Sequence, residues 1–435
     1  MKLPAFCMKT GPHREENEMT KKELVQYVED HRDELIMLTS QLIQIKSENP
    51  TGTQREVVDF VETFLKDAGI EYKETGCNPD YPCVVAGYGK DMGFSLIING
   101  HVDVVPAGDL NQWEFEPFSG EITETQILGR GTSDMKAGVA GVLFALSLFA
   151  RKQVPLNGNI RLHIVSDEES GGQFGTQWLC ANGYGEHADA CLVAEPTSMN
   201  TIEIGQKGGL LLKIKAYGKS AHGSLGDFKG ENAILKLSKV LSHVSLLSKI
   251  EGHFSQRQTK PLMDSKMLAE RENHIPGLGR VIDHVSTNEG LIKGGTRHNM
   301  VPDYCEATVD VRLPIGVNKE EIDETLKQIL EISGVEGVEY ELQYKSDANF
   351  TDHEAPIVLA FKENAELLLG KEVIPAYQWA SSDARDYRKL GIPTIQFGPS
   401  NTVGIHSYNE TVQIEDVVTA AKIYVAAICD LMEIK

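Results

Sequence analysis

The feature that most constrains the fold is an alternation between short apolar runs and a long helical pattern. Apolar runs of strand length occupy residues 94–98, 159–165 and 189–194, and residues 136–152 carry apolar side chains at helical spacing. Strands that alternate with helices in this way are typical of an α/β sheet with helices on its faces. The sequence therefore predicts an α/β fold class, with a mixed sheet flanked by helices.

Two amphipathic helices are predicted to open this fold. Residues 20–45 place apolar side chains at helical spacing after Thr20, and residues 51–69 repeat the pattern. The second pattern starts from a threonine cap and ends on Gly69, as helices often do.

A different pattern interrupts the α/β domain. Between residues 206 and 348 the predicted order is β-α-β-β-α-β, including a strand near 280–286. This order describes a self-contained α+β domain. Helix, buried strand and helix then return. We therefore predict a flexible N-terminal extension at 1–19, an α/β domain made of 20–205 and 349–435, and an inserted domain at 206–348.

Net charge argues against two classes of partner. The 435 residues include 63 acidic and 42 basic side chains, for a formal net charge of −21. A surface this acidic repels phosphate backbones and anionic lipid headgroups. We therefore expect no nucleic acid and no membrane as a partner, whereas divalent cations are suitable ones.

The cysteines and the N-terminal residues indicate the cellular compartment in which this protein is expected. The seven cysteines are scattered and show no C-x-x-C spacing, which favours neither a disulfide framework nor a cysteine zinc site. No apolar stretch approaches a membrane span, and residues 1–19 lack the pattern of a signal peptide. We expect a cytoplasmic protein, with Met19 as an alternative start.

Acidic and histidine residues gather where the predicted strands end. They are His101, Asp103, Glu168, Glu169, Glu195 and His406, together with Asp134 just before a helix. In open α/β sheets ligands bind beyond the carboxyl ends of the strands, so these side chains should converge on one edge. Carboxylate and imidazole ligands without thiolate suit zinc, cobalt or manganese.

Each of these residues also has an ordinary explanation. A single histidine after a strand is most often a solvated loop residue, Asp134 could cap the helix that follows, and the acids at 167–169 could form an exposed turn. These explanations weaken when the residues are taken together, because one strand end after another would have to carry an acid or a histidine by chance.

Six segments resemble signature segments of the M20 family of metallopeptidases and amidohydrolases. They are HVDVVPAGDLNQWEFEPFSG, GRGTSDMKAGVAG, SDEESGG, AEP, GKSAHGS and GIHSYNE. They run in family order, and the resemblance covers about residues 20–435. The family includes acetylornithine deacetylase, succinyl-diaminopimelate desuccinylase, aminoacylase and glutamate carboxypeptidases. The inserted domain falls where the family places its lid and dimerisation domain.

The resemblance implies a site for two divalent metal ions, zinc or else cobalt or manganese. It implies that His101 and Glu195 hold one ion, that Glu169 and His406 hold the other, and that Asp134 bridges the two. A carboxylate can bridge two cations about 3.5–4 Å apart, which agrees with this reading.

The resemblance also assigns catalytic residues. Glu168 would be the general base, taking a proton from a metal-bridging water so that hydroxide attacks the substrate, and Asp103 would fix the ring tautomer of His101. His222 resembles the lid histidine that reaches across a dimer to the substrate carbonyl in the partner subunit. Its alternative is a surface histidine at a strand end.

Four further residues concern substrate binding. Asn299 and Arg312 match lid positions that bind substrate oxygen or carboxylate, although Arg312 could equally be an outward residue of a half-exposed strand. The segment with Ser382 and Asp383 departs from the glycine-rich pattern of many relatives, and residues 224–226 depart after the lid histidine. Both departures concern the substrate and leave the hydrolytic chemistry intact.

These patterns lead to one expected function and several alternatives. We expect a metal-dependent hydrolase of linear amides other than peptides, cleaving a small N-acyl amino acid or N-acyl amine as a deacetylase, desuccinylase or deformylase, and working as a homodimer through the inserted domain. The alternatives are a dipeptidase or carboxypeptidase of the same family and an inactive metal-binding homologue. A dinucleotide-binding enzyme, suggested by Gly129 and Gly131 before a helix, fails because Asp134 would repel the pyrophosphate.

Overall fold

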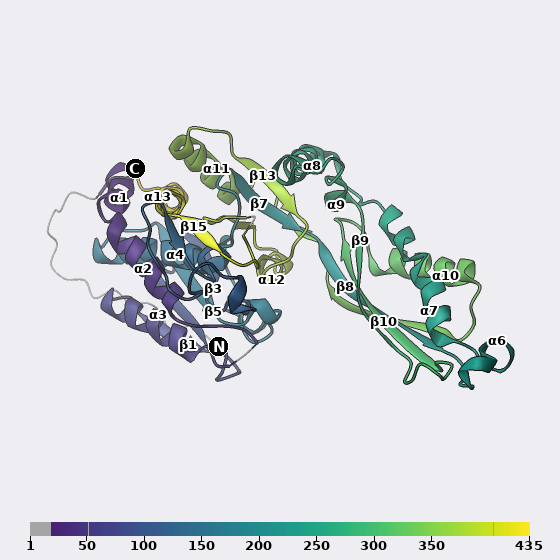
Figure 1. Cartoon of the computed structure of the whole chain (residues 1–435). Coiled ribbons are helices and arrows are strands. Elements are labelled where there is room, and N and C mark those ends of the chain that lie inside the picture. Colours follow the sequence, from purple (N-terminus) through teal and green to yellow (C-terminus); the bar gives the residue numbers. More distant parts are fainter. Residues whose placement is uncertain (1–18, 51, 403) are drawn as a thin grey trace. The chain divides into compact units, whose positions relative to one another are not determined.

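The chain packs as two compact units in the computed structural model, which describes residues 19–50, 52–402 and 404–435. Unit 1 comprises the chain up to Ile204 with Thr351–Pro375 and Ser382–Lys435, and unit 2 comprises Gly205–Phe350 with Ala376–Ser381. In Figure 1 unit 1 carries both ends of the colour scale, and unit 2 is teal and green. The predicted extension 1–19 lies outside the described residues except for Met19.

Unit 1 is built on a mixed sheet, which confirms the predicted fold class. Its strand order is β1 (Tyr72–Thr75), β2 (Cys83–Gly89), β5 (Gly158–Val165), β3 (Phe94–His101), β6 (Ala190–Val193), β14 (Thr394–Gln396) and β7 (Thr201–Gln206). The four central strands are parallel neighbours, and the outer strands pair antiparallel. The three predicted apolar runs are β3, β5 and β6.

Strand β7 also pairs with the short β12 (Asn349–Phe350), and two further strand pairings involve unit 1. β13 (Ile374–Gln378) pairs with β7, and the boundary between the units falls within both of these strands. β4 (Gln126–Leu128) and β15 (Thr411–Gln413) form a separate antiparallel pair. This pair joins two loops that lie far apart in the sequence.

Helices surround the sheet of unit 1. They are α1 (Lys21–Asp30), α2 (Arg32–Gln44), α3 (Arg55–Asp67), α4 (Ala137–Arg151), α5 (Thr176–Ala181), α11 (Pro356–Leu369), α12 (Ala384–Lys389) and α13 (Ile414–Leu431), with short turns η1 (Leu110–Gln112), η2 (Thr132–Lys136) and η3 (Glu168–Ser170). The purple α1 and the yellow α13 lie side by side (Figure 1), so helices from early and late in the sequence pack together in unit 1.

The opening helices differ from the prediction in two details. The single helix expected at 20–45 breaks at His31, whose ring stacks on Tyr27 and whose Nδ1 lies 2.9 Å from the Tyr27 carbonyl oxygen. The threonine cap expected for the second helix is wrong, because Gln54 occupies the cap position without a side-chain hydrogen bond. Thr20 caps the first helix, in a capping box with Glu23 that the sequence pattern did not predict.

Helix α4 is the core helix of unit 1. Every residue from Ala137 to Phe149 is buried, and the helix packs against α2, α13 and β3. By length and composition alone residues 132–151 could cross a membrane, contrary to the expectation that no stretch approaches that length, but 89% of the tested window is buried inside the structure. A helix that is apolar on all sides belongs in a protein core or a membrane, and here the core accounts for it.

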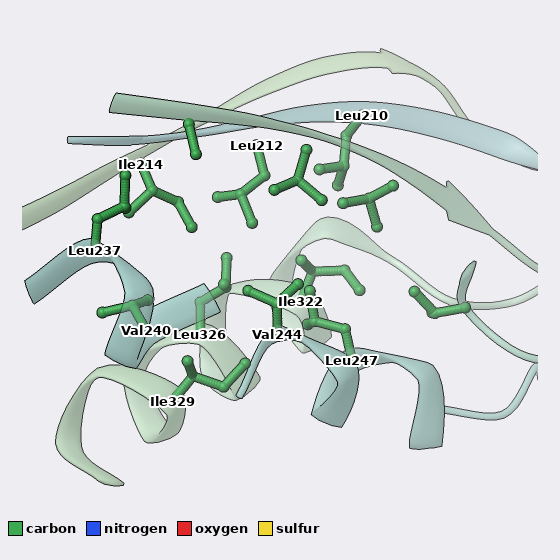
Figure 2. Packing of buried hydrophobic residues seen from close by; sticks show 14 of the residues in the cluster. Leu210, Leu212, Ile214, Leu237, Val240, Val244, Leu247, Ile322, Leu326 and Ile329 are labelled. Atoms are coloured by element: carbon green, nitrogen blue, oxygen red, sulfur yellow. The ribbon is translucent and has the colours of Figure 1, made fainter. Parts of the chain in front are cut away.

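Unit 2 is a four-stranded antiparallel sheet covered by helices. The strand order is β11 (Val338–Ser346), β8 (Gly208–Tyr217), β10 (Tyr304–Leu313) and β9 (Ser286–Gly294). Figure 2 shows apolar side chains of β8 facing those of α7 (Ala233–Leu241) and α10 (Lys319–Ser333). Residues that alternate along β8 are buried in this core, as the sequence pattern predicts.

The main elements of unit 2 follow the predicted β-α-β-β-α-β order, as β8, α7, β9, β10, α10 and β11, and further elements lie between and beside them. They are η4 (Gly223–Leu225), α6 (Gly226–Lys229), η5 (Val244–Lys249), η6 (Gln256–Gln258), α8 (Thr259–Asn273), α9 (Arg280–Asp283) and β12 (Asn349–Phe350). The strand expected near 280–286 is present but begins later, because residues 280–283 form α9 and β9 starts at Ser286. Helix α8 was not predicted, because its first two buried positions are Pro261 and Ser265, which interrupt an apolar pattern that only Leu268 and Ala269 continue.

Residues 376–381 pack with unit 2, although the sequence pattern predicts that they belong to the α/β domain. The Tyr377 backbone N–H donates to the Ser265 hydroxyl oxygen at 2.8 Å, and the Gln378 carbonyl accepts from the Lys207 N–H at 3.3 Å. The first bond ties the end of β13 to α8, the helix that the sequence did not reveal, and the second ties it to the residue between β7 and β8.

Candidate metal centre

The five predicted metal ligands come from loops at one edge of the unit 1 sheet. His101 ends β3, Glu169 lies in η3 just after β5, and Glu195 follows β6. Asp134 lies in η2 before α4, and His406 lies in the loop between β14 and β15. Because β3, β5 and β6 are parallel, their carboxyl ends meet, and the fold collects these side chains where ligands of open α/β sheets bind.

Asp134 lies between the two histidines. Its Oδ1 is 3.0 Å from Nε2 of His101, and its Oδ2 is 3.1 Å from Nε2 of His406. The His101 Nε2 also lies 3.7 Å from a Glu195 oxygen, and the His406 Nε2 lies 3.2 Å from a Glu169 oxygen. The two oxygens of one carboxylate thus face two different histidine and glutamate pairs, which is the arrangement that a carboxylate bridging two cations requires.

Two groups of donor atoms are close enough to share a metal ion. One consists of His101, Glu168 and Glu195, and the other of His101, Asp134 and Glu169, with all donor atoms of a group within 4.8 Å of one another. Imidazole nitrogen and carboxylate oxygen suit zinc, cobalt or manganese, so the donor set fits the predicted metals. Glu168 lies in the first group, so its carboxylate is beside the ligands, where a base must be.

Burial or close carboxylates raise the pKa values of several side chains in this centre. Burial, with Glu195 close by, raises the pKa of Glu168 well above its usual range, and burial with Asp134 nearby raises the pKa of Glu195 to about 7. Hydrogen bonds to two carboxylates raise the pKa of His406 to about 10. Without a cation these groups retain protons, and a divalent cation would displace them.

Asp103 holds the backbone that carries the two neighbouring glutamates. Its buried carboxylate accepts the N–H of Glu168 at 3.3 Å, the N–H of Glu169 at 3.1 Å, and the Asn49 amide at 2.7 Å. The Nδ1 atom of His101 lies closer to the Asp103 carbonyl oxygen, at 2.9 Å, than to the Asp103 carboxylate, at 3.4 Å. Asp103 therefore contacts the His101 ring mainly through its main chain.

Ser382 and Asp383, predicted to bind substrate, are buried in unit 1. Asp383 is 1% exposed, and its Oδ2 accepts from the Thr176 hydroxyl at 2.6 Å. Its other oxygen has no hydrogen-bond partner among the described residues. The Ser382 hydroxyl donates to the side-chain oxygen of Gln396. This burial favours a structural role for the pair.

The predicted lid residues belong to unit 2. His222 is exposed and its Nδ1 lies 2.6 Å from the Ser224 hydroxyl, while Asn299 is exposed without a described hydrogen bond of its side chain. The Arg312 Nε donates to Asp310 at 2.7 Å on β10. Since these residues lie in a different unit from the metal centre, their catalytic roles stay predictions.

Three buried residues beside the centre were missed from the sequence. The Asn49 amide binds Asp103, the Lys136 ammonium donates to the Ile45 carbonyl at 2.7 Å, and the Glu410 carboxylate accepts backbone N–H groups of the Asp134 loop. Lys136 and Glu410 both lie inside the quoted motif segments, which is the signal that could have found them. Asn49 carried no such signal.

A glycine sets the approach of α4 to the loop after β6. A Cβ atom at Gly138 would lie 2.0 Å from the carbonyl oxygen of Ala194, well inside van der Waals contact. Gly138 follows Asp134 by four residues, and Ala194 directly precedes Glu195. The separation of the predicted ligands Asp134 and Glu195 therefore depends on the absence of a side chain at Gly138.

Comparison with known proteins gives consistent sequence matches. The sequence model described as Peptidase family M20/M25/M40 matches residues 97–430. The chain is 26% identical over 414 residues to succinyl-diaminopimelate desuccinylase of Orientia tsutsugamushi (strain Ikeda), covering 91% of this chain and 95% of that protein. It is 27% identical over 439 residues to N-formyl-4-amino-5-aminomethyl-2-methylpyrimidine deformylase of Bacillus subtilis (strain 168), covering 91% and 94% respectively.

A solved structure shows the same fold. The chain is similar to an M20 family metallo-carboxypeptidase from Sulfolobus solfataricus, with a TM-score of 0.78, 23% sequence identity, and coverage of 93% of this chain and 100% of that one. The matches confirm the resemblance seen in the sequence motifs.

Proposed function

Because the chain belongs to peptidase family M20/M25/M40, a family of hydrolases, we propose that it cleaves the amide bond of a small N-acyl amino acid or N-acyl amine. The observation that carries this proposal is the placement of Asp134, whose two oxygens lie 3.0 and 3.1 Å from two different histidines. The names of the two curated relatives, a desuccinylase and a deformylase, support cleavage of an acyl group from an amine.

Five residues would hold two divalent ions: His101, Asp134, Glu169, Glu195 and His406. Bound zinc, cobalt or manganese would polarise the amide carbonyl and lower the pKa of a coordinated water. The alternation of imidazole and carboxylate donors around Asp134 supports this assignment.

Glu168 would move the proton. Its carboxylate lies in the same donor group as His101 and Glu195, and burial raises its pKa, which suits a group that both accepts and donates a proton. Glu168 would take a proton from the attacking water and give it to the nitrogen of the leaving amine. The hydrogen bonds from the backbone of residues 168 and 169 to Asp103 would hold this carboxylate in position.

We also propose that the protein works as a homodimer through unit 2. β9 is an edge strand, and its Leu291 and Ile292 are 60% and 58% exposed, which a second copy of the sheet could cover. His222 of one chain would then steady the substrate carbonyl oxygen of the partner's site, and Asn299 and Arg312 would bind substrate oxygen or carboxylate.

A small-molecule substrate and a reducing compartment such as the cytoplasm complete the proposal. The six described cysteines are all free, which suits a reducing compartment. The net charge of −21 supports the absence of nucleic-acid and anionic membrane partners.

The proposal is tested by a substrate panel. Protein stripped of metal and then loaded with zinc or cobalt is incubated with N-acetyl, N-succinyl and N-formyl amino compounds and with dipeptides, and the released amine is measured. We expect release from at least one N-acyl substrate, loss of activity on chelation and recovery on adding metal. Cleavage of dipeptides alone would favour the peptidase alternative, and full activity of metal-free protein would refute the mechanism.

A further inference from the structure

A buried ion pair lies beside the proposed metal centre. Arg130 and Glu410 are 3% and 1% exposed, and the Arg130 Nη1 donates to the Glu410 Oε2 at 2.6 Å. Arg130 lies in the loop before Asp134, and Glu410 lies four residues after His406. The pair therefore joins two loops that each carry a proposed ligand.

Glu410 also binds the backbone of the Asp134 loop. Its second oxygen, Oε1, accepts the N–H of Ser133 at 2.8 Å and the N–H of Asp134 at 3.2 Å. The main chain adds to this connection, because the Glu410 carbonyl accepts the Gly129 N–H at 3.0 Å. All three bonds join residues before or at Asp134 to a single residue of the His406 loop.

Arg130 connects these loops to the segment that follows β3. Its guanidinium carbon lies 5.1 Å from the centre of the Trp113 ring, within the range of a cation–π contact. The Trp113 indole N–H donates to the Ala107 carbonyl at 2.9 Å. The same ring meets Tyr408 edge to face, at 6.1 Å between ring centres. Arg130 is thus the point at which three segments of the centre meet.

The His406 loop depends on these contacts. The His406 side chain is half exposed, and its backbone has a φ of 58°, in the left-handed region that is unfavourable for a residue with a side chain. Beyond His406 the loop is held by Asn409, whose side-chain oxygen accepts the Glu114 N–H at 2.7 Å, and by Glu410. A strained backbone of this kind persists only where its surroundings fix it.

We infer that Arg130 and Glu410 are positioning residues that set the spacing between Asp134 and His406. This inference rests on the proposed function, since it takes both residues as ligands of one metal ion. Neither Arg130 nor Glu410 is within the donor groups of the centre, so the pair acts through Asp134 and His406. Residues that orient metal ligands typically change metal affinity by about 10–100-fold when mutated.

The test compares metal binding by three proteins. Glu410→Gln keeps the shape of the side chain and an oxygen for the backbone N–H groups, but removes the charge that pairs with Arg130. Thr351→Val is the matched control in unit 1. Thr351 is buried, and its hydroxyl donates to the Thr394 carbonyl at 2.6 Å and accepts the Thr394 N–H at 2.8 Å, away from all three segments of the centre.

The affinities and number of bound zinc ions are measured by competition with a chromogenic chelator, and the thermal midpoint is measured on metal-free protein. We expect wild type and Thr351→Val to bind two ions per chain with equal affinities. In Glu410→Gln at least one ion should bind about 10–100-fold more weakly, the ion between Asp134 and His406 most of all.

Two results would overturn the inference for different reasons. If Glu410→Gln lowers the metal-free thermal midpoint but binds both ions as wild type does, the pair stabilises the fold and positions nothing. If wild type itself does not bind two ions, the proposed function fails and the inference fails with it. Should Glu410→Gln not fold, the double variant Arg130→Gln with Glu410→Gln leaves no charge unpaired and gives the same measurement.

Discussion

At the scale of single residues, two adjacent glutamates are expected to do different work. Glu168 and Glu169 lie in one turn, and the N–H groups of both bind the Asp103 carboxylate. Their side chains separate from this common anchor: Glu168 groups with His101 and Glu195, whereas Glu169 approaches His406 at 3.2 Å. One side chain is thus free to move a proton while the other can hold a cation.

This separation predicts different losses in the two glutamine variants. Glu168→Gln should keep both metal ions and lose about 10²–10⁴ in kcat, the usual contribution of a general base. Glu169→Gln should bind metal more weakly. Metal analysis and initial rates of the two purified variants check this. The opposite pattern, with metal lost from Glu168→Gln and kept by Glu169→Gln, would reverse the two roles.

His163 gives a prediction about pH that does not depend on metal. The ring is fully buried on β5, its Nδ1 lies 2.8 Å from the Tyr387 hydroxyl, and burial lowers its pKa to about 3. The unfolded chain protonates this residue near pH 6.5, so the folded state loses stability as the pH falls from about 6.5 toward 3. This loss amounts to at most about 1.4 kcal/mol per pH unit.

Denaturant unfolding of metal-free wild type and His163→Gln at several pH values tests whether protonation of His163 destabilises the folded state at low pH. The free energy of unfolding should fall more steeply with decreasing pH in wild type than in the variant. Because the carboxylates of the centre titrate in both proteins, only the difference between the two curves reports on His163. Parallel curves would contradict the prediction.

At the scale of secondary-structure elements, the sequence predicted the strands and helices that are apolar and regular. Examples are β3, β5, β6 and α4, whose apolar side chains predict that these elements are buried. The residues just beyond the three strands converge at one edge of the sheet. Elements without a regular apolar pattern were missed or misplaced. Helix α8 buries a proline and a serine beside only Leu268 and Ala269, and β9 exposes most of its residues, so neither shows a clear apolar period.

The same reason explains which parts of the candidate site were missed. His101 and Glu195 adjoin apolar strands, so their place in the fold can be derived from the chain itself. Asn49 and Glu410 contribute through hydrogen bonds to the backbone of other loops. Such bonds depend on loop geometry, which leaves no periodic pattern in the sequence.

The contact between α4 and the loop after β6 makes a prediction at this scale. Gly138→Ala places a methyl group against the Ala194 backbone, which cannot move without moving Glu195, so the variant should lose about 1–3 kcal/mol of stability and bind metal more weakly. Gly141→Ala in the same helix is the control, because its added Cβ meets the Tyr424 ring at 2.9 Å. Equal metal affinity in both variants would contradict the prediction.

At the scale of the whole molecule, the chain divides its proposed chemistry between two units. The proposed metal ligands and Glu168 lie in unit 1 and His222 lies in unit 2, and under the proposed function each site would take His222 from the partner chain. The net charge of −21 acts on the molecule as a whole, because an acidic surface raises the local concentration of divalent cations.

Mixed dimers test this division. Glu168→Ala and His222→Ala should each be nearly inactive alone. In a two-fold dimer that exchanges His222, a mixed dimer has one site with both defects and one site with neither. Random mixing makes about half of the dimers mixed, so roughly a quarter of all sites should recover. Co-expression and hydrolysis assays measure this, and no recovery despite proven mixed dimers would exclude the exchange.

Gly138 also has a consequence for how this chain can diverge. Functional positions are usually sought among residues with reactive side chains, and Gly138 has no side chain. Yet any descendant that keeps the present separation of Asp134 and Glu195 has to keep a glycine four residues after this aspartate, because even one methyl group would collide with the Ala194 backbone. A related chain that keeps all five proposed ligands but has a larger residue at the position of Gly138 is therefore expected to have a different separation of the residues matching Asp134 and Glu195. Comparing the proposed ligands alone would not detect this change.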